Sequence, residues 1–282
     1  TQLFRSGSGA IGTVGGWNSV TGVVTLSSAS DVVNFEVNMT LQTRNPTTGS
    51  VTSSASAYVV AVNRTAGTIT VSGSMGGSAG FAWGPSAGDT LNVVGDYNLA
   101  LSGLAGWLPA TSPGSTDSWF GVNRSSDPTR LSGVRFNGTS ESIEEAIIDG
   151  SLLVAREGGN PDVCIMNFQS YAALEKSLGA KAQYISMKGP AEIMFPGILI
   201  NGAGGQIKVF PDRSCTAKTA YLLQMDTWKL YSLGPAPHIA KYADGLEMLR
   251  VYNSDAAELR VVSYANLGCN APGFNAVISL GA

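Results

Sequence analysis

The sequence predicts an α+β fold, and three observations support that prediction. Residues 20–98 contain short runs of Val, Ile, Thr and aromatic residues separated by Gly, Asn and Ser, a pattern typical of antiparallel strands joined by turns. Residues 140–178 have the pattern of a helix, a buried strand and a second helix, which is the densest structural signal in the chain. The residues after 178 return to strand-like runs, which we expect to pack against the same core.

The N-terminal part is expected to be β-rich after a short extended segment. Residues 1–19 contain five glycines and predict an extended arm rather than a packed element. Residues 32–42 alternate over much of their length between apolar and polar side chains, which predicts a strand. The letters N-R-T-A-G at 63–67 separate two strand-like runs, and Gly67 is available for a positive φ angle, so we expect a hairpin there. Residues 20–98 are therefore expected to form a small antiparallel barrel or sandwich.

An amphipathic helix is predicted over residues 142–157. Its apolar side chains recur with a period of 3.6 residues, so one stripe faces a core. Ser142 followed by Glu145 predicts a capping box, and the Gly-Gly pair at 158–159 predicts the helix end. The apolar run 163–166 then predicts a buried strand, and Asn167 is expected to cap a second helix.

Further strands are expected toward the C-terminus. They are predicted at residues 197–200, 206–210, 220–225, 228–233, 246–252, 257–264 and 274–280. The intervening loop at 99–140 is broken by prolines, and its aromatic side chains Trp107, Trp119 and Phe120 lie among Ser, Thr and Gly. Two interpretations stay open for these aromatics: packing on the chain's own core, or contact with another subunit.

The composition is poor in charge. Charged residues make up 13% of the 282 residues, against roughly 25% in a typical soluble domain. The mean hydropathy is +0.12, yet no apolar run approaches the roughly 20 residues of a membrane helix. Such a surface fits an extracellular-type β protein, or a subunit whose surface is mostly covered by neighbours. The net charge of −3 argues against a protein that grips nucleic acid through its phosphates.

No catalytic constellation is recognisable. The chain has one histidine, His238, which nearly excludes His-dependent catalysis and multi-His metal sites. The three cysteines are far apart in sequence and are expected to be free buried thiols. Glu144 and Glu145 fall in the first turn of the predicted helix, where acids favour the helix dipole. We therefore expect no enzymatic activity and no cofactor, and favour a structural or binding role.

Five long strings in the second half of the chain are distinctive. They are M-D-T-W-K-L-Y-S-L-G (225–234), D-G-L-E-M-L-R (244–250), Y-A-N-L-G-C-N-A-P-G-F-N-A (264–276), N-P-D-V-C-I-M-N-F-Q-S-Y-A-A-L-E (160–175) and S-W-F-G-V-N-R-S-S-D-P-T-R-L (118–131). These strings resemble a group of tailed-bacteriophage major capsid proteins. The resemblance covers roughly residues 110–282.

The resemblance implies the Hong Kong 97-like phage capsid fold. It implies a peripheral domain with a spine helix and long strands, a mixed α/β axial domain, and a β-barrel-like insertion in the extended loop. The implied division is 1–19 as the rest of an N-terminal arm, 20–98 as the insertion, 99–140 as a connecting loop, 141–160 as the spine helix, 161–219 as the axial domain, and 220–282 as peripheral strands and C-terminal segment.

The implied function is that of a major capsid protein in a virion. Such a chain would assemble, in the host cytoplasm, into pentamers and hexamers of an icosahedral head shell that encloses double-stranded DNA without reading its sequence and without contacting a membrane. Scaffold, portal, maturation-protease and decoration proteins are the implied partners. Thr1 is compatible with removal of an upstream segment during maturation.

One feature departs from some members of that family. Those members cross-link their subunits covalently through a lysine of the extended loop, whereas residues 1–175 of this chain contain no lysine. We therefore expect no such covalent cross-link.

The candidate inter-subunit residues and the alternative function follow from these expectations. The interface candidates are Trp107, Trp119, Phe120, Arg124 and Arg130. The two arginines lie near Asp127 and are candidates for ion pairs either between or within subunits. The alternative is a β-rich decoration or host- or glycan-binding virion protein, which would be marked by an exposed aromatic platform, for example at Trp17 or Trp83.

Overall fold

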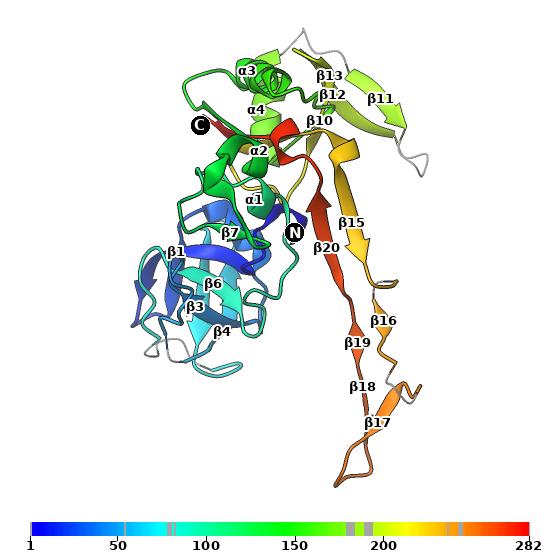
Figure 1. The fold of residues 1–282 in the computed structure, drawn as a ribbon. Coiled ribbons are helices and arrows are strands. Elements are labelled where there is room, and N and C mark those ends of the chain that lie inside the picture. Colours follow the sequence, from blue (N-terminus) through cyan, green and yellow to red (C-terminus); the bar gives the residue numbers. More distant parts are fainter. Residues whose placement is uncertain are drawn as a thin grey trace.

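The computed structural model describes residues 2–53, 55–77, 81, 83–178, 184–188, 194–235, 237–241 and 245–281. It consists of a six-stranded barrel, a seven-stranded sheet with two helices, and a long two-stranded hairpin that projects away from both (Figure 1). Strand makes up 36% of the chain and helix 20%. The protein is therefore mostly β.

The barrel is built from the N-terminal third of the chain. Its antiparallel strands close in the order β1-β2-β5-β4-β3-β6. Their bounds are β1 Ala10–Asn18, β2 Val23–Leu26, β3 Thr40–Arg44, β4 Ala57–Asn63, β5 Thr68–Ser72 and β6 Thr90–Val93. Alternate side chains of the strands point inward and form one buried cluster that includes Leu41, Val59 and Leu91. The predicted hairpin is confirmed, since β4 pairs with β5 and Gly67 adopts φ +65°.

The barrel begins earlier than the sequence suggested. The glycine-rich stretch assigned to an extended arm contains β1, which pairs with both β2 and β6 and closes the barrel. Its glycines make room for neighbours: a Cβ on Gly12 would lie 3.0 Å from Phe35 Cζ, and one on Gly15 would lie 3.0 Å from the backbone nitrogen of Ser27. Glycine in this strand reflects close packing rather than a lack of structure.

The predicted strand at 32–42 is wrong over most of its length. A 3₁₀ helix, η2 (Ala29–Asn34), precedes β3, and Phe35 enters the core from the turn between them. Val37 is exposed instead of sharing a buried face with Phe35. The apolar–polar alternation that suggested a strand over residues 32–42 therefore comes mostly from the 3₁₀ helix η2 and the loop after it.

The main sheet has seven strands in the order β11-β12-β13-β10-β14-β21-β9. Their bounds are β9 Val134–Gly138, β10 Val163–Met166, β11 Tyr184–Lys188, β12 Met194–Gly202, β13 Gly205–Pro211, β14 Thr219–Leu223 and β21 Ala276–Leu280. The β10–β13 and β21–β9 pairs are parallel, and the other pairs are antiparallel. Strands β10 and β14 lie at the centre of the sheet, and β11 and β9 form its two edges.

The two faces of this sheet pack on different partners. Cys164, Leu222 and Ile278 point to the side covered by helices α3 (Ile143–Arg156) and α4 (Phe168–Leu178). Their neighbours along the strands, such as Tyr221 and Val277, point to the other side and pack with Phe4, Leu104 and Leu108. The alternation of a β-strand thus places one sheet between two apolar clusters.

Both predicted helix starts are confirmed. The Ser142 hydroxyl accepts the backbone N–H of Glu145 at 3.3 Å, and the Glu145 carboxylate accepts the backbone N–H of Ser142 at 3.1 Å, which completes the capping box. The side chain of Asn167 caps α4 by accepting the N–H of Gln169 at 3.0 Å. Gly158, with φ +92°, follows the end of α3.

The predicted Hong Kong 97-like fold class, an α+β capsid fold with a spine helix, is wrong. The helix expected to be the spine has 14 residues and ends where Gly159 packs against Phe274, with its Cβ position only 2.7 Å from Phe274 Cα. In addition, β10, expected in a separate axial domain, lies between β13 and β14 of the same sheet as the expected peripheral strand β21. Strand pairing over the whole C-terminal part therefore replaces the division into a helical spine and an α/β domain.

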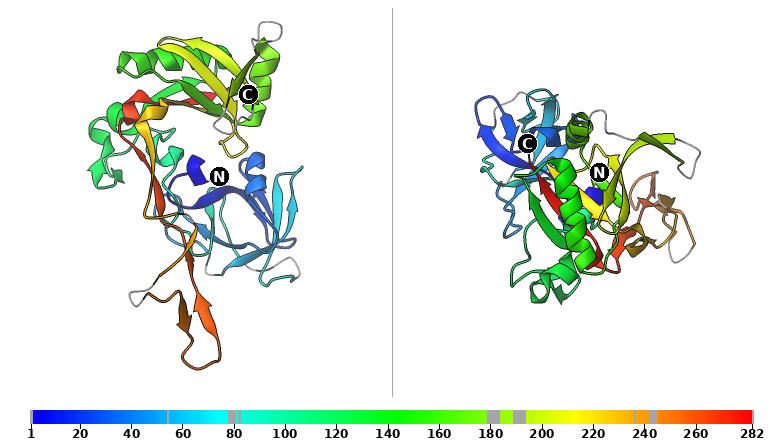
Figure 2. Two further views of the ribbon diagram at one scale, coloured as in Figure 1. Left: turned by 90° about the vertical axis from the view of Figure 1, so that its right-hand side faces the viewer. Right: turned by 90° about the horizontal axis from the view of Figure 1, so that it is seen from above.

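The remaining elements are short. They are η1 Gln2–Phe4, α1 Leu104–Trp107, β7 Ser118–Trp119, β8 Val122–Asn123, η3 Arg124–Ser126, α2 Pro128–Ser132, η5 Met225–Thr227 and η6 Pro272–Phe274. Most of them connect the barrel to the main sheet, and the barrel lies below that sheet in both side views (Figures 1 and 2).

The hairpin arm, residues 228–269, leaves the main sheet after η5 and returns just before η6. Three short ladders form it: β15 (Trp228–Ser232) with β20 (Ala265–Cys269), β16 (His238–Ile239) with β19 (Val261–Val262), and β17 (Met248–Arg250) with β18 (Ala257–Leu259). It extends alongside and beyond the barrel without joining it (Figure 2).

Candidate assembly surfaces

The hairpin arm has no core of its own. None of the described residues between 229 and 268 is buried. Two strands cannot enclose apolar side chains, and an isolated two-stranded hairpin is marginally stable in water. The arm therefore depends on something outside itself to cover its side chains.

Many of those side chains are large and apolar. Ten exposed ones in the described part of the arm are Leu230, Tyr231, Leu233, Ile239, Leu246, Met248, Tyr252, Leu259, Val261 and Tyr264. Leu233 is 87% exposed and Tyr252 is 102% exposed, so these two make almost no contact with their own chain. A concentration of large exposed apolar side chains in one segment marks an interaction site.

At the root of the arm, exposed side chains line a cleft. Leu99, Tyr231, Leu233 and Tyr264 line a cavity of about 490 Å³ between the arm and the chain that follows the barrel. None of the described residues that line this cleft is charged. Its apolar character continues the surface of the arm.

Hydrogen bonds fix the root of the arm to the main sheet. Asn275 is fully buried, and its Oδ1 accepts the indole N–H of Trp228 at 2.8 Å and the backbone N–H of Gln224 at 2.9 Å. Its Nδ2 donates to the carbonyl oxygen of Ala271 at 2.9 Å and to Thr227 Oγ1 at 3.1 Å. One amide thus holds both strands of the arm where they leave the folded body, so the direction of the arm is defined although its tip is free.

The predicted interface aromatics form a cluster beside this root. Trp107, Trp119 and Phe120 contact one another, with ring centroids 5.1 to 5.7 Å apart. Trp107 donates its indole N–H to the carbonyl oxygen of Leu267 at 2.9 Å, so the cluster holds strand β20. The indole nitrogen of Trp119 is buried and has no hydrogen-bond partner within the described chain. The rings of Trp107 and Trp119 are half-buried and pack within the chain.

Phe120 is the exposed member of the cluster. Its side chain is 64% exposed, and its backbone has φ +49°, an uncommon conformation for a residue other than glycine. Packing on Trp107 and Trp119 holds the ring at the surface. Of the three aromatics, Phe120 is the one available to a neighbour.

The two candidate arginines have different surroundings. Arg124 is 6% exposed and forms an ion pair with Asp117 at 2.6 Å, while its guanidinium lies 4.7 Å from the Trp119 ring centroid. Arg124 therefore acts within its own chain. Arg130 is exposed, and Asp127, which was expected as an ion-pair partner, instead accepts the backbone N–H of Arg130 at 3.1 Å and caps α2.

The aromatic platform proposed for the alternative function is exposed only in part, since Trp17 is half-buried and Trp83 is buried. Trp17, Phe81 and Trp83 do contact one another, with centroids 5.8 to 6.4 Å apart. However, Trp83 is only 3% exposed and donates its indole N–H to the carbonyl oxygen of Ala55 at 3.0 Å. Trp83 is part of the barrel core, so this cluster cannot offer its ring to a glycan.

Reactive side chains are buried and dispersed. Cys164, Cys215 and Cys269 are all buried free thiols. Burial raises the pKa of Cys215 to about 12, and it also raises the pKa values of Cys164 and Cys269, so all three stay protonated near neutral pH. In the part of the chain that the structure describes, no three His, Cys, Asp or Glu side chains gather as metal ligands would.

Two charged groups meet between barrel and sheet. Arg5 and Asp31 line a cavity of about 160 Å³, together with Arg213 and Cys215. Burial raises the pKa of Asp31 and lowers the pKa of Arg5, and the attraction between the two groups opposes both shifts. Arg5 and Asp31 attract each other, and Arg213 adds a second positive charge to the lining of the cavity.

Sequence reasoning missed the hairpin arm as a site. It identified the hairpin around residues 246–264 but expected its strands to pack on the core. Apolar residues at consecutive positions, such as Leu230-Tyr231 and Val261-Val262, place side chains on both faces of a strand. These consecutive apolar residues are visible in the sequence, but a strand that is buried on both faces of a sheet has the same pattern.

The chain was compared with models of known protein families and with curated proteins, and neither comparison gives a match. Among the described residues, no helix is both long enough and apolar enough to cross a bilayer.

Proposed function

We propose that this protein is a self-assembling structural subunit, and that its assembly is the icosahedral head shell of a tailed phage, in which it is the major capsid protein. The observation that carries the proposal is the hairpin arm, a 42-residue extension with exposed apolar side chains, in which none of the described residues between 229 and 268 is buried. An arm of this kind is stable when a neighbouring copy covers it.

Self-association explains the arm better than a single small ligand does. Its exposed side chains are spread along the full length of the arm and across both strands, so covering them requires an extended protein surface. In a closed shell, each copy contacts several others at once, and many weak contacts add up to a stable assembly.

The composition supports the same proposal. Interface cores are depleted of charged residues, and this chain contains 13% of them. The net charge of −3 suits a container that encloses DNA without binding it tightly. The resemblance of the strings at 118–131, 160–175 and 225–276 to phage major capsid proteins supports the particular kind of shell, although the fold expected from that family is not adopted.

The test is assembly of the protein expressed alone, followed by electron microscopy and sedimentation. We expect closed shells, tubes, or pentamers and hexamers. The variant Leu233→Ser/Leu259→Ser should abolish them while leaving the circular dichroism spectrum and the melting temperature of the subunit unchanged, because both leucines are exposed in the free chain.

A matched control is Leu3→Ser/Leu152→Ser, which removes two exposed leucines, neither of them on the arm or in the cleft at its root. Leu3 lies on η1 and Leu152 on α3, so this control should weaken assembly less than the arm variant. A wild-type chain that stays monomeric at high concentration, with its arm protected from proteases, would contradict the proposal.

A further inference from the structure

Residues 252–261, which form the tip of the hairpin arm and the strand after it, are all exposed. The turn between β17 and β18 is closed by the backbone N–H of Val251, which donates to the carbonyl oxygen of Ala256 at 3.0 Å. Tyr252 projects from this turn and is 102% exposed, and Arg250 and Asp255 are exposed on either side of it. Tyrosine flanked by charge is a typical anchor residue of protein interfaces.

A small pocket lies at the other end of the arm. Arg130, Glu157, Ala271, Gly273 and Phe274 line a cavity of about 250 Å³ where α2, the end of α3 and η6 meet. Its volume falls below the roughly 300–1,000 Å³ of pockets that hold drug-sized ligands, so it suits a single side chain. Its lining is one aromatic ring and small residues, with one cation and one anion.

The pocket is part of the rigid body of the subunit. Gly273 packs against α2, since a Cβ on it would lie 3.1 Å from Arg130 Cα. Glu157 is the C-cap residue of α3, and its backbone N–H donates to the carbonyl oxygen of Val154 at 3.0 Å. The pocket is therefore formed before any partner arrives.

The charges of the tip and of the pocket are complementary. The tip offers Tyr252 between a cation, Arg250, and an anion, Asp255, and the pocket offers Phe274 with an anion, Glu157, and a cation, Arg130. Within the described residues, neither Arg250 nor Asp255 takes part in an ion pair, and the guanidinium of Arg130 also takes part in none. Glu157 has one ion pair, with the exposed Arg156 beside it, at 3.3 Å.

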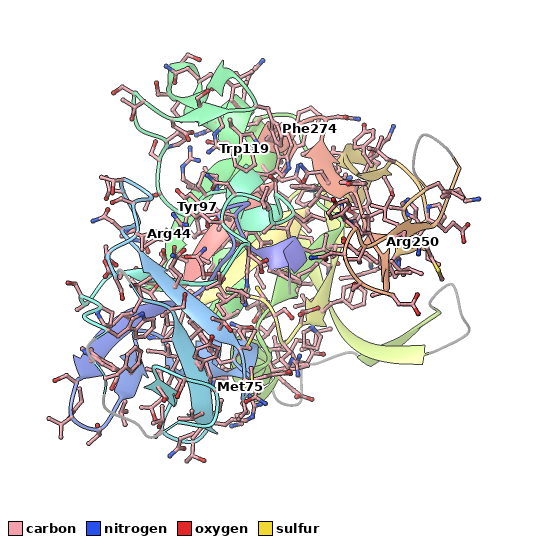
Figure 3. The ribbon with its side chains drawn as sticks, turned by 90° about the horizontal axis from the view of Figure 1, so that it is seen from below. Arg44, Met75, Tyr97, Trp119, Arg250 and Phe274 are labelled. Carbon is pink, nitrogen blue, oxygen red and sulfur yellow. The ribbon has the colours of Figure 1, made fainter. Side chains whose placement is uncertain are left out.

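We propose that the tip of one copy docks in this pocket of the next copy, with Tyr252 against Phe274, Arg250 paired with Glu157, and Asp255 paired with Arg130. This inference deepens the proposed function and rests on it. The partner must be a second copy because the tip lies at the far end of the arm from η6 in the same chain (Figure 1). Figure 3 labels one residue of each site, Arg250 next to the tip and Phe274 in η6.

The contact has a defined symmetry. Each copy carries one tip and one pocket on different parts of its surface, so the contact is heterologous, or head-to-tail. Repeating such a contact produces a ring when the rotation closes and an open chain when it does not. The docking therefore accounts for rings of copies, the units from which a shell would be built.

The other cleft is a poorer receptor for the tip. The cavity at the root of the arm is lined by Leu99, Tyr231, Leu233 and Tyr264, and its described lining residues carry no charge. Docking the tip there would bury Arg250 and Asp255 without partners, which is costly. The cleft therefore serves as the control site in the test.

The first experiment is disulfide trapping in the full chain. The variant Tyr252→Cys/Ala271→Cys should give a ladder of disulfide-linked oligomers on a non-reducing gel, and the ladder should disappear with reductant. The three native cysteines are buried and should not contribute. The control Tyr252→Cys/Leu99→Cys should give no ladder, and a ladder from this control in place of the first would overturn the inference.

The second experiment is charge reversal. Arg130→Glu and Asp255→Arg should each raise the subunit concentration needed for assembly by at least about tenfold, because each places like charges together. The double variant Arg130→Glu/Asp255→Arg should restore assembly. All of these side chains are exposed, so the subunit fold should not change.

The outcomes separate the two proposals. Wild-type assemblies that form while both the trap and the rescue fail would overturn the tip-to-pocket contact and leave the proposed function intact. A wild-type chain that forms no assembly at any concentration would overturn both.

Discussion

The barrel and the hairpin arm are both built from antiparallel strands, but the barrel buries its apolar side chains within the chain and the arm leaves them exposed. The barrel closes its six strands on themselves, which removes free edges and buries thirteen apolar residues in one cluster. The arm leaves both edges of each two-stranded ladder open, and none of its described residues from 229 to 268 is buried. The same kind of secondary structure is therefore self-sufficient in one region and dependent on a partner in the other.

The largest expected effect tests the barrel side of this comparison. Leu41→Ala removes a fully buried side chain from the barrel core and should lower the free energy of unfolding by about 2–5 kcal/mol. The same change on the arm, Leu230→Ala, should change it by less than about 0.5 kcal/mol, because Leu230 is 61% exposed. Denaturant unfolding of the dispersed subunit measures both. Equal losses would show that the arm contributes to the stability of the free chain.

The next effect tests the connection between the arm and the body. Asn275→Ala leaves the indole N–H of Trp228 and the backbone N–H of Gln224 without their acceptor, which should cost about 1–3 kcal/mol. Hydrogen exchange should become faster at the root of the arm and stay unchanged in the barrel. Asn270→Ala, at an exposed asparagine nearby, is the matched control and should change neither. Unchanged exchange at the root in Asn275→Ala would mean that other contacts orient the arm.

The smallest expected effect lies at the start of helix α3, outside both the barrel and the arm. Ser142→Ala removes the N-cap of α3 and should lower the free energy of unfolding by about 1 kcal/mol. Hydrogen bonds from Ser142 lower the pKa of Glu145, so the stabilisation by this carboxylate is complete above the ordinary glutamate pKa and is lost as the pH falls through the lowered pKa.

The pH dependence has its own control. Glu145→Gln keeps an acceptor for the Ser142 N–H but does not titrate, so the acid-induced loss at this site should disappear. Thermal melts between neutral and acidic pH measure the difference between the two chains. A wild type and a Glu145→Gln variant with parallel pH profiles would contradict this assignment.

Local signals were predictable from the sequence because they depend on neighbouring residues. The capping box at Ser142 and Glu145, the cap at Asn167 and the positive φ of Gly67 each follow from a few adjacent side chains. The fold class did not follow, because β10 pairs with β13 and β14, and such pairing is set by residues distant in sequence. The resemblance to a capsid family suggested a different arrangement and misdirected the prediction of the spine helix.

The candidate site was predictable only in part. The sequence singled out Phe120 and Arg130, which are exposed, together with Trp107, Trp119 and Arg124, which pack within the chain. It did not single out Tyr252 or Leu233, since apolar residues in a strand indicate burial without saying which molecule provides it. Glycine content similarly hid β1, where small residues allow close packing and do not indicate a loop.

The place of β21 in the main sheet has a consequence for synthesis on the ribosome. This strand, Ala276–Leu280, lies between β14 and β9, so the sheet is complete only after residue 280 has been made, whereas the last barrel strand ends at Val93. At about 5–20 residues per second, the two events are separated by roughly ten to forty seconds. During that time the barrel can fold while β9 and the helix that follows it wait without their partner. The nascent chain therefore exposes the apolar side chains of β9 and of the following helix until β21 has been made, and chaperones can bind them during that time.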